Sequence, residues 1–92
     1  MRTKIQALIT IVNGRDRSAF GKFYLEYEDL LYKIATRYAA NSGDAEALLE
    51  RLFEELWNRP EVLWQTREKH LSVLLVKRMI FLCEERALGR AE

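Results

Sequence analysis

The chain has little of what marks disulfide-linked, metal-binding or membrane-spanning proteins. It holds one cysteine, one histidine and one proline in 92 residues. A single Cys83 excludes an internal disulfide framework, which fits a reducing cytoplasm, and one Cys with one His cannot form a Cys/His zinc site. The sequence also lacks the run of about 18 uncharged apolar residues that is needed to span a bilayer. We therefore expect a cytoplasmic protein with no membrane contact and no metal.

The sequence also lacks the features of a catalytic site. His70 stands alone, with no neighbour that marks it as a general base. The adjacent pairs Glu54-Glu55 and Glu84-Glu85 would point about 100° apart on a helix, too far round to share a proton. No glycine-rich phosphate loop is present. The sequence therefore predicts a protein that is not an enzyme and needs no cofactor.

What is present is the composition of an ordinary globular domain. Hydrophobic residues make up 49% and charged residues 32% of the chain, and the formal net charge is +1. This length predicts one domain over residues 1–92. Since four glycines and one proline leave few turn signals, we expect an all-α fold, a small bundle of four to five helices.

Hydrophobic spacing predicts where those helices lie. The predicted ranges are 5–12, about 16–38, 45–57 and about 66–88, with residues 60–69 open between a short helical turn and a loop. The second range is the clearest, because apolar residues recur at three- and four-residue steps from Phe20 to Tyr38. The middle of the last range, from Leu71 to Cys83, is apolar on nearly all sides. Such a helix lies in the centre of a bundle or under a partner.

Residues that end or cap helices lie at the bounds of these ranges. Gly14 is expected to end the first helix, because glycine is the usual residue just past a helix C-terminus. Either Asp16 or Ser18 then offers a side-chain oxygen to cap the second helix. Residues 41–44 both stop that helix and cap the next one. Gly89 is expected to end the last helix.

Charges cluster along the chain although they cancel overall. Residues 1–22 carry five basic residues and one acidic residue, whereas residues 44–57 carry five acidic residues and one basic residue, Arg51. Glu46, Glu50 and Glu54 are spaced by four, so they share one helix face, where each like-charged pair costs a few tenths of a kcal/mol. The stripe favours an acidic docking surface for a basic partner, the alternative being an ordinary solvated face.

Basic side chains mix with an aromatic ring after residue 57. This mixture is typical of surfaces for single-stranded nucleic acid, where cations follow the phosphates and rings stack on bases. The candidate residues are Arg59, Trp64, Arg67, Lys69, Lys77, Arg78 and Arg86. Four glutamates in the same stretch dilute the positive charge, and the pattern leaves Trp64 open between a core position and a stacking platform.

Two segments carry a recognisable order of residues. Asp16 is followed by Ala-Phe at 19–20, Phe-Tyr at 23–24, Leu-Tyr at 31–32 and Ala-x-Arg at 35–37. The second segment has Asp-Ala-Glu at 44–46 and Phe-x-x-Leu-Trp at 53–57. Together they resemble region 2 of bacterial RNA polymerase sigma factors of the extracytoplasmic-function group. The resemblance covers about residues 14–88, and residues 1–13 add a short N-terminal helix.

The resemblance implies a helical domain that docks on core RNA polymerase and helps open promoter DNA. In this family the Asp-Ala-Glu helix binds the coiled coil of the largest polymerase subunit. Carried over by position, that role falls on Asp44, Glu46, Glu50, Arg51 and Glu54. The following loop and last helix capture the single-stranded −10 element of the non-template strand, a role that would fall on residues 58–69 with Lys77, Arg78 and Arg86.

The second half of the chain departs from the family pattern. Leu74 to Met79 stand where the family has a Trp-containing segment, and Glu84-Glu85 stand where basic residues are more usual. The family also carries a second domain that reads the −35 element. The chain is then a fragment of a longer sigma factor, or a complete small protein whose partner chain supplies −35 recognition; an anti-sigma factor is a further partner to consider. The alternative function is a repurposed interaction module, in which the last helix binds another protein or a second copy.

Overall fold

The computed structural model describes the backbone of residues 4–90 and the side chains of residues 4–86. Helices alone form the regular structure of this part of the chain, and they are α1 (Ile5–Asn13), α2 (Arg17–Tyr38), α3 (Ser42–Asn58), α4 (Glu61–Trp64) and α5 (Leu71–Arg90). The prediction of an all-α bundle with four to five helices is therefore confirmed. Within residues 4–90, none of these helices combines the length and the apolar character needed to cross a membrane.

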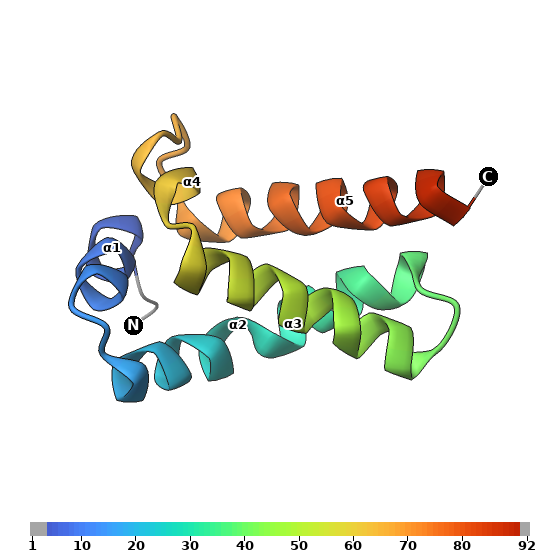
Figure 1. Cartoon of the computed structure of the whole chain (residues 1–92), viewed down its shortest axis with the longest axis horizontal. Helices are drawn as coiled ribbons and strands as arrows, with labels where there is room; N and C mark the ends of the chain where they lie inside the picture. The colour runs from blue at the N-terminus through green and yellow to red at the C-terminus, as the bar shows by residue number, and fades with distance from the viewer. Residues whose placement is uncertain (1–3, 91–92) are drawn as a thin grey trace.

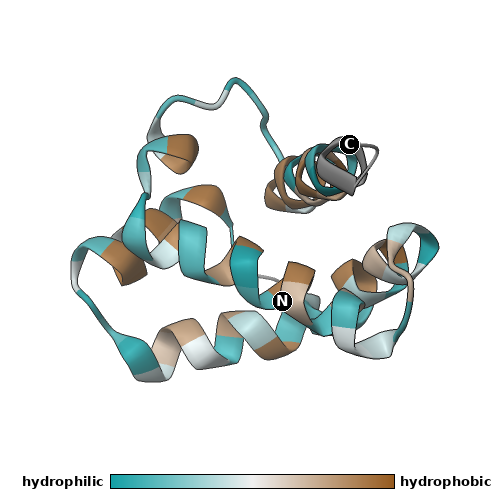
Figure 2. Cartoon of the chain, turned by 45° about the vertical axis from the view of Figure 1, so that its right-hand side comes forward, coloured by the Kyte–Doolittle hydropathy of each residue, from teal (hydrophilic) through white to brown (hydrophobic). Residues whose placement is uncertain are grey.

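Three long helices make the body of the molecule. α3 runs back along α2 in the opposite direction, and α5 packs on both of them (Figure 1). α1 and α4 lie together at one end, where α1 also packs on α2. Hydrophilic and hydrophobic residues alternate along α2 and α3 (Figure 2), as expected for helices that bury one face.

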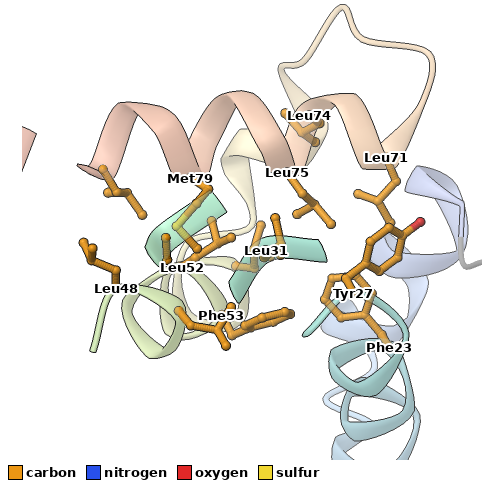
Figure 3. Close-up of a cluster of buried hydrophobic side chains, with 14 of the residues drawn as sticks. Phe23, Tyr27, Leu31, Leu48, Leu52, Phe53, Leu71, Leu74, Leu75 and Met79 are labelled. Atoms are coloured by element: carbon orange, nitrogen blue, oxygen red, sulfur yellow. The ribbon is translucent and has the colours of Figure 1, made fainter. Parts of the chain in front are cut away.

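The core forms where the buried faces of α2, α3 and α5 meet. α2 contributes Phe23, Tyr27, Leu31 and Ala35, which are spaced by four and so lie on one face. They meet a row from α3 and a row from α5, seen together in Figure 3: Leu48, Leu52 and Phe53, with Leu71, Leu74, Leu75 and Met79. Leu82 and Cys83 of α5 are also buried, while Val73 and Phe81 stay 38% and 49% exposed.

The N-terminal caps of α2 and α3 follow the expected chemistry. The Asp16 carboxylate accepts a hydrogen bond from the Ala19 N–H at 3.0 Å, so Asp16 rather than Ser18 caps α2. The Asn41 side chain accepts a hydrogen bond from the Asp44 N–H at 2.8 Å. Because Asn41 is the cap, α3 begins at Ser42, three residues before the predicted start.

The predicted bounds of the last helix were wrong at both ends. α5 begins at Leu71 rather than near residue 66. The Thr66 hydroxyl accepts a hydrogen bond from the Glu68 N–H at 3.1 Å, a local turn that competes with helix formation. At the other end α5 continues to Arg90, past Gly89. A glycine weakens a helix by about 1 kcal/mol but does not forbid it.

The turn from α1 to α2 places an arginine in the left-handed region. Gly14 ends α1 as predicted, but its φ is −82°, and the residue with positive φ is Arg15, at 53°. The Asp16 N–H bonds to the Ile11 carbonyl oxygen at 3.1 Å. The Arg15 N–H bonds to the Val12 carbonyl oxygen at the same distance, which completes a Schellman motif. For a residue with a side chain this conformation costs about 1–2 kcal/mol.

Candidate docking furrow and nucleic-acid surface

An open furrow lies between α2 and α3, with two hollows that share Tyr24. The first, of about 330 Å³, is lined by the carboxylates of Glu28, Asp29, Glu46 and Glu50 and by the rings of Tyr24 and Tyr32. The second, of about 540 Å³, is lined by Arg15, Arg17, Gly21, Tyr24, Glu54 and Trp57, among others. We call them the acidic end and the basic end of the furrow.

An aromatic layer forms the floor of the furrow. The Tyr24 and Phe53 rings lie 4.5 Å apart between centroids, and the Phe20 and Trp57 rings lie 4.9 Å apart. Both are tilted contacts between α2 and α3, and their centroid separations lie in the range of attractive aromatic pairs. These ring contacts join the two walls of the furrow, which α2 and α3 form.

Carboxylates dominate the acidic end. Glu46 and Glu50 are exposed and form no ion pair with any side chain among residues 4–86. The pKa of Tyr24 is raised by burial, then by its hydrogen bond with Glu28 and by the nearby negative charges of Glu28, Glu50 and Glu46. The phenol therefore keeps its proton at neutral pH. The acidic end can offer several oxygen acceptors and two rings to a cationic side chain.

Two of the five residues predicted to bind the polymerase lie elsewhere. Asp44 has a side chain only 5% exposed, pairs with Arg86, and accepts a hydrogen bond from the Ala40 N–H at 3.1 Å. Arg51 donates to Glu85 at 2.6 Å. Both side chains tie α3 to other parts of the fold, whereas Glu46, Glu50 and Glu54 line the furrow as one stripe.

Sequence reasoning missed the half of the furrow that comes from α2. Tyr24, Glu28 and Tyr32 face the α3 stripe and are themselves spaced by four. Their spacing is the signal that could have revealed them, because it places them on one face of α2. Tyrosines in an amphipathic helix are usually assigned to the core, and an isolated glutamate on such a helix is usually assigned to a solvated face.

Ion pairs connect α3 to α5. Asp44 pairs with Arg86, Arg51 with Glu85, and Glu55 with Arg78. The Glu55–Arg78 pair is bidentate, with Nε bonded to Oε2 at 2.9 Å, and both side chains are largely buried. Glu85 thus has a partner within the fold, since its carboxylate neutralises Arg51.

The predicted nucleic-acid residues divide into two groups. Lys77, Arg78 and Arg86 are held in ion pairs, Lys77 with Glu68 at 2.5 Å. The other four lie on α4 or in the adjoining loops, are exposed, and make no ion pair in the described part of the chain: Arg59, Trp64, Arg67 and Lys69. Trp64 is 53% exposed while its neighbour Leu63 is 2% exposed, so Leu63 takes the core position. We call this group the α4 surface.

Comparison with known proteins adds no relative. No protein-family model, curated protein or solved structure matches the chain. The likeness to sigma region 2 stays a prediction, carried by the residue order at 16–37 and 44–57.

Proposed function

We propose that the chain is a transcription initiation domain that docks on core RNA polymerase through the acidic end of the furrow. The observation that supports this most is the unequal use of charge on α3. Asp44, Arg51 and Glu55 are neutralised by α5, whereas Glu46 and Glu50 face an open furrow without an ion pair. Carboxylates kept together and unpaired favour a basic partner.

The partner proposed is the coiled coil of the largest polymerase subunit, which the sequence resemblance implies. A helix laid along the furrow would present one side chain per turn to Glu46, Glu50 and Glu54. Charge complementarity of this kind accelerates association and weakens steeply with salt. Polymerase docking by this surface should therefore be fast at low ionic strength and salt-sensitive.

A charge-matched pair of variants tests the docking function. We would measure binding of a coiled-coil fragment of the largest subunit by isothermal titration calorimetry. Glu46→Lys/Glu50→Lys should lose about tenfold or more in affinity, while Glu61→Lys/Glu84→Lys, with the same change in charge away from the furrow, should lose little. Equal losses in the two variants, or no binding by the unmodified chain, would contradict the proposal.

The same domain is proposed to contact the single-stranded −10 region through the α4 surface. An exposed indole and three exposed cations within residues 59–69 would combine stacking with phosphate contacts. In fluorescence anisotropy on non-template −10 oligonucleotides, Trp64→Ala should weaken binding by about 5- to 150-fold, equivalent to one stacked base. Lys77→Gln, which removes a cation held by Glu68, is the control. Affinity that ignores salt would count against this surface. Recognition of a −35 element would come from a second domain or a partner chain.

A second candidate function is the repurposed interaction module. Leu30, Val73 and Val76 line a shallow apolar hollow of about 420 Å³ between α2 and α5. This hollow includes Val73, one of the two large apolar side chains of α5 that stay exposed among the described residues. Analytical ultracentrifugation tests whether a second copy of the chain binds there. A dimer that Val73→Lys converts to a monomer would favour this function over polymerase docking.

A further inference from the structure

The basic end of the furrow is built around Trp57. The Arg15 guanidinium lies 4.1 Å from the centroid of the Trp57 ring, and the Arg17 guanidinium lies 5.6 Å from it. Arg15 Nη1 also donates a hydrogen bond to the Trp57 carbonyl oxygen at 2.8 Å. The two cations are thus held on one indole by cation–π contacts. Neither forms an ion pair within the described residues, so their remaining N–H groups are available.

Two positions on the walls of this hollow lower the stability of the fold. Arg15 has a positive φ of 53°, a conformation unfavourable for any residue with a Cβ. Gly21 lies inside α2, where glycine is less stable than alanine. A Cβ at Gly21 would meet nothing within 4 Å, so the fold itself does not require glycine there. The left-handed conformation of Arg15 belongs to the Schellman motif that ends α1, whereas the glycine at position 21 has no structural reason. A local rule broken without a structural reason tends to mark a functional site.

The chemistry of the hollow favours a carboxylate on a helix. Two guanidinium groups offer paired N–H donors of the kind that bind carboxylates or phosphates. The bare backbone at Gly21 lets another chain come close. Glu54 lines the same hollow, and its negative charge would repel the row of phosphates in a nucleic acid. Glu54 is also the third member of the stripe, so the helix lying over Glu46 and Glu50 would reach this hollow.

We propose that the basic end binds an aspartate or glutamate side chain of the helix whose basic residues lie over the acidic end. The furrow, acidic at one end and basic at the other, then accepts that helix in one direction only. This inference rests on the proposed docking function, in which basic residues of the partner helix bind the acidic end. It adds an acidic residue of the partner helix, which sets the direction of that helix in the furrow.

Synthetic stapled helices test the direction. The first peptide has two arginines spaced by four, to face Glu46 and Glu50, and a glutamate one turn further toward its C-terminus. The second peptide has the glutamate one turn before the arginines, toward its N-terminus. The third peptide has glutamine in place of the glutamate. One of the two glutamate peptides should bind the unmodified chain about fivefold more tightly than the glutamine peptide. Arg17→Gln should abolish this preference, while Lys22→Gln, which removes an exposed cation of α2 outside the hollow, should keep it.

Gly21→Gln separates close approach from fold stability. Glutamine is a good helix former and its side chain would enter the hollow. The variant should unfold at a higher urea concentration than the unmodified chain and yet bind the preferred peptide more weakly.

The other outcomes overturn the inference in recognisably different ways. If all three peptides bind with the same affinity, the docking function stands and the directional inference is wrong. If no peptide binds, the docking function fails and the inference fails with it. If Arg17→Gln weakens binding of a single-stranded oligonucleotide and leaves the peptide preference unchanged, the basic end is a nucleic-acid contact and the inference is overturned.

Discussion

The two faces of α3 use charge in opposite ways. On the face toward α5, Asp44, Arg51 and Glu55 each find a partner of opposite sign. On the face toward the furrow, Glu46 and Glu50 stand opposite further acid, Glu28 and Asp29 of α2. One face is therefore neutralised inside the molecule, while the other gathers negative charge that no ion pair among the described side chains neutralises. Residue type does not decide which carboxylates are structural; the element opposite them does.

Removing Asp44 should give the largest loss of stability. Its carboxylate is buried, accepts the Ala40 N–H and pairs with Arg86. We expect Asp44→Ala to lower the free energy of unfolding in urea by about 1.5–3 kcal/mol, the range for hydrogen bonds to charged groups. Glu46→Ala, on the furrow face of the same helix, should change it by less than about 0.5 kcal/mol. Similar losses in both variants would erase the contrast between the two faces.

A double-mutant cycle on Glu55 and Arg78 should give the next largest effect. Because the pair is bidentate and largely buried, we expect a coupling energy of about 1 kcal/mol from the unfolding of Glu55→Gln, Arg78→Gln and the double variant. The Arg51–Glu85 pair is about half exposed, and its coupling should be only a few tenths of a kcal/mol. The reverse order would mean that burial does not set the strength of these pairs.

Gly21→Ala should stabilise the chain. A Cβ at this position meets no neighbouring atom, and alanine exceeds glycine in a helix interior by about 0.5–1 kcal/mol. The higher free energy of unfolding should appear as a higher urea concentration at the unfolding midpoint. The slope of the free energy of unfolding against urea concentration should stay unchanged. A decrease would show that glycine is needed by the fold, and the basic end of the furrow would lose one of its distinguishing features.

The smallest effect is expected for Glu50→Gln. It removes like-charge repulsion with Glu46 and Glu54, each four residues away on the same helix, which should raise the free energy of unfolding by a few tenths of a kcal/mol. The gain should disappear near 1 M salt, where screening is nearly complete. A loss of stability instead would mean that the stripe is already neutralised within the fold.

Local patterns in the sequence predicted much of this structure. The spacing of apolar residues from Phe20 to Tyr38 corresponds to α2, and Asp16, one of the two predicted cap candidates, accepts a hydrogen bond from the N–H three residues away. The stripe of Glu46, Glu50 and Glu54 required only the period of a helix. In each case the determining neighbours lie within one or two turns, so a single sequence contains them.

Interactions between distant residues could not be predicted. Arg78 meets a carboxylate 23 residues away, and Arg51 meets one 34 residues away. Nothing in the sequence distinguishes Arg78, which is paired, from Arg67, which is exposed and unpaired within the described residues. The hydrogen bond from the Arg15 side chain to the Trp57 carbonyl oxygen, 42 residues further on, could not be predicted for the same reason.

The placement of the two tryptophans gives the chain a built-in pair of optical reporters. Trp57 lies beneath two guanidinium groups at the furrow, and Trp64 is half exposed on the α4 surface. The emission of an indole depends on its contact with water and with charged groups, so the two rings should respond to different binding events. A chain with Trp64→Phe would report only on the furrow. Titrating it beside the unmodified chain would show, without any label, which of the two surfaces an added molecule occupies first.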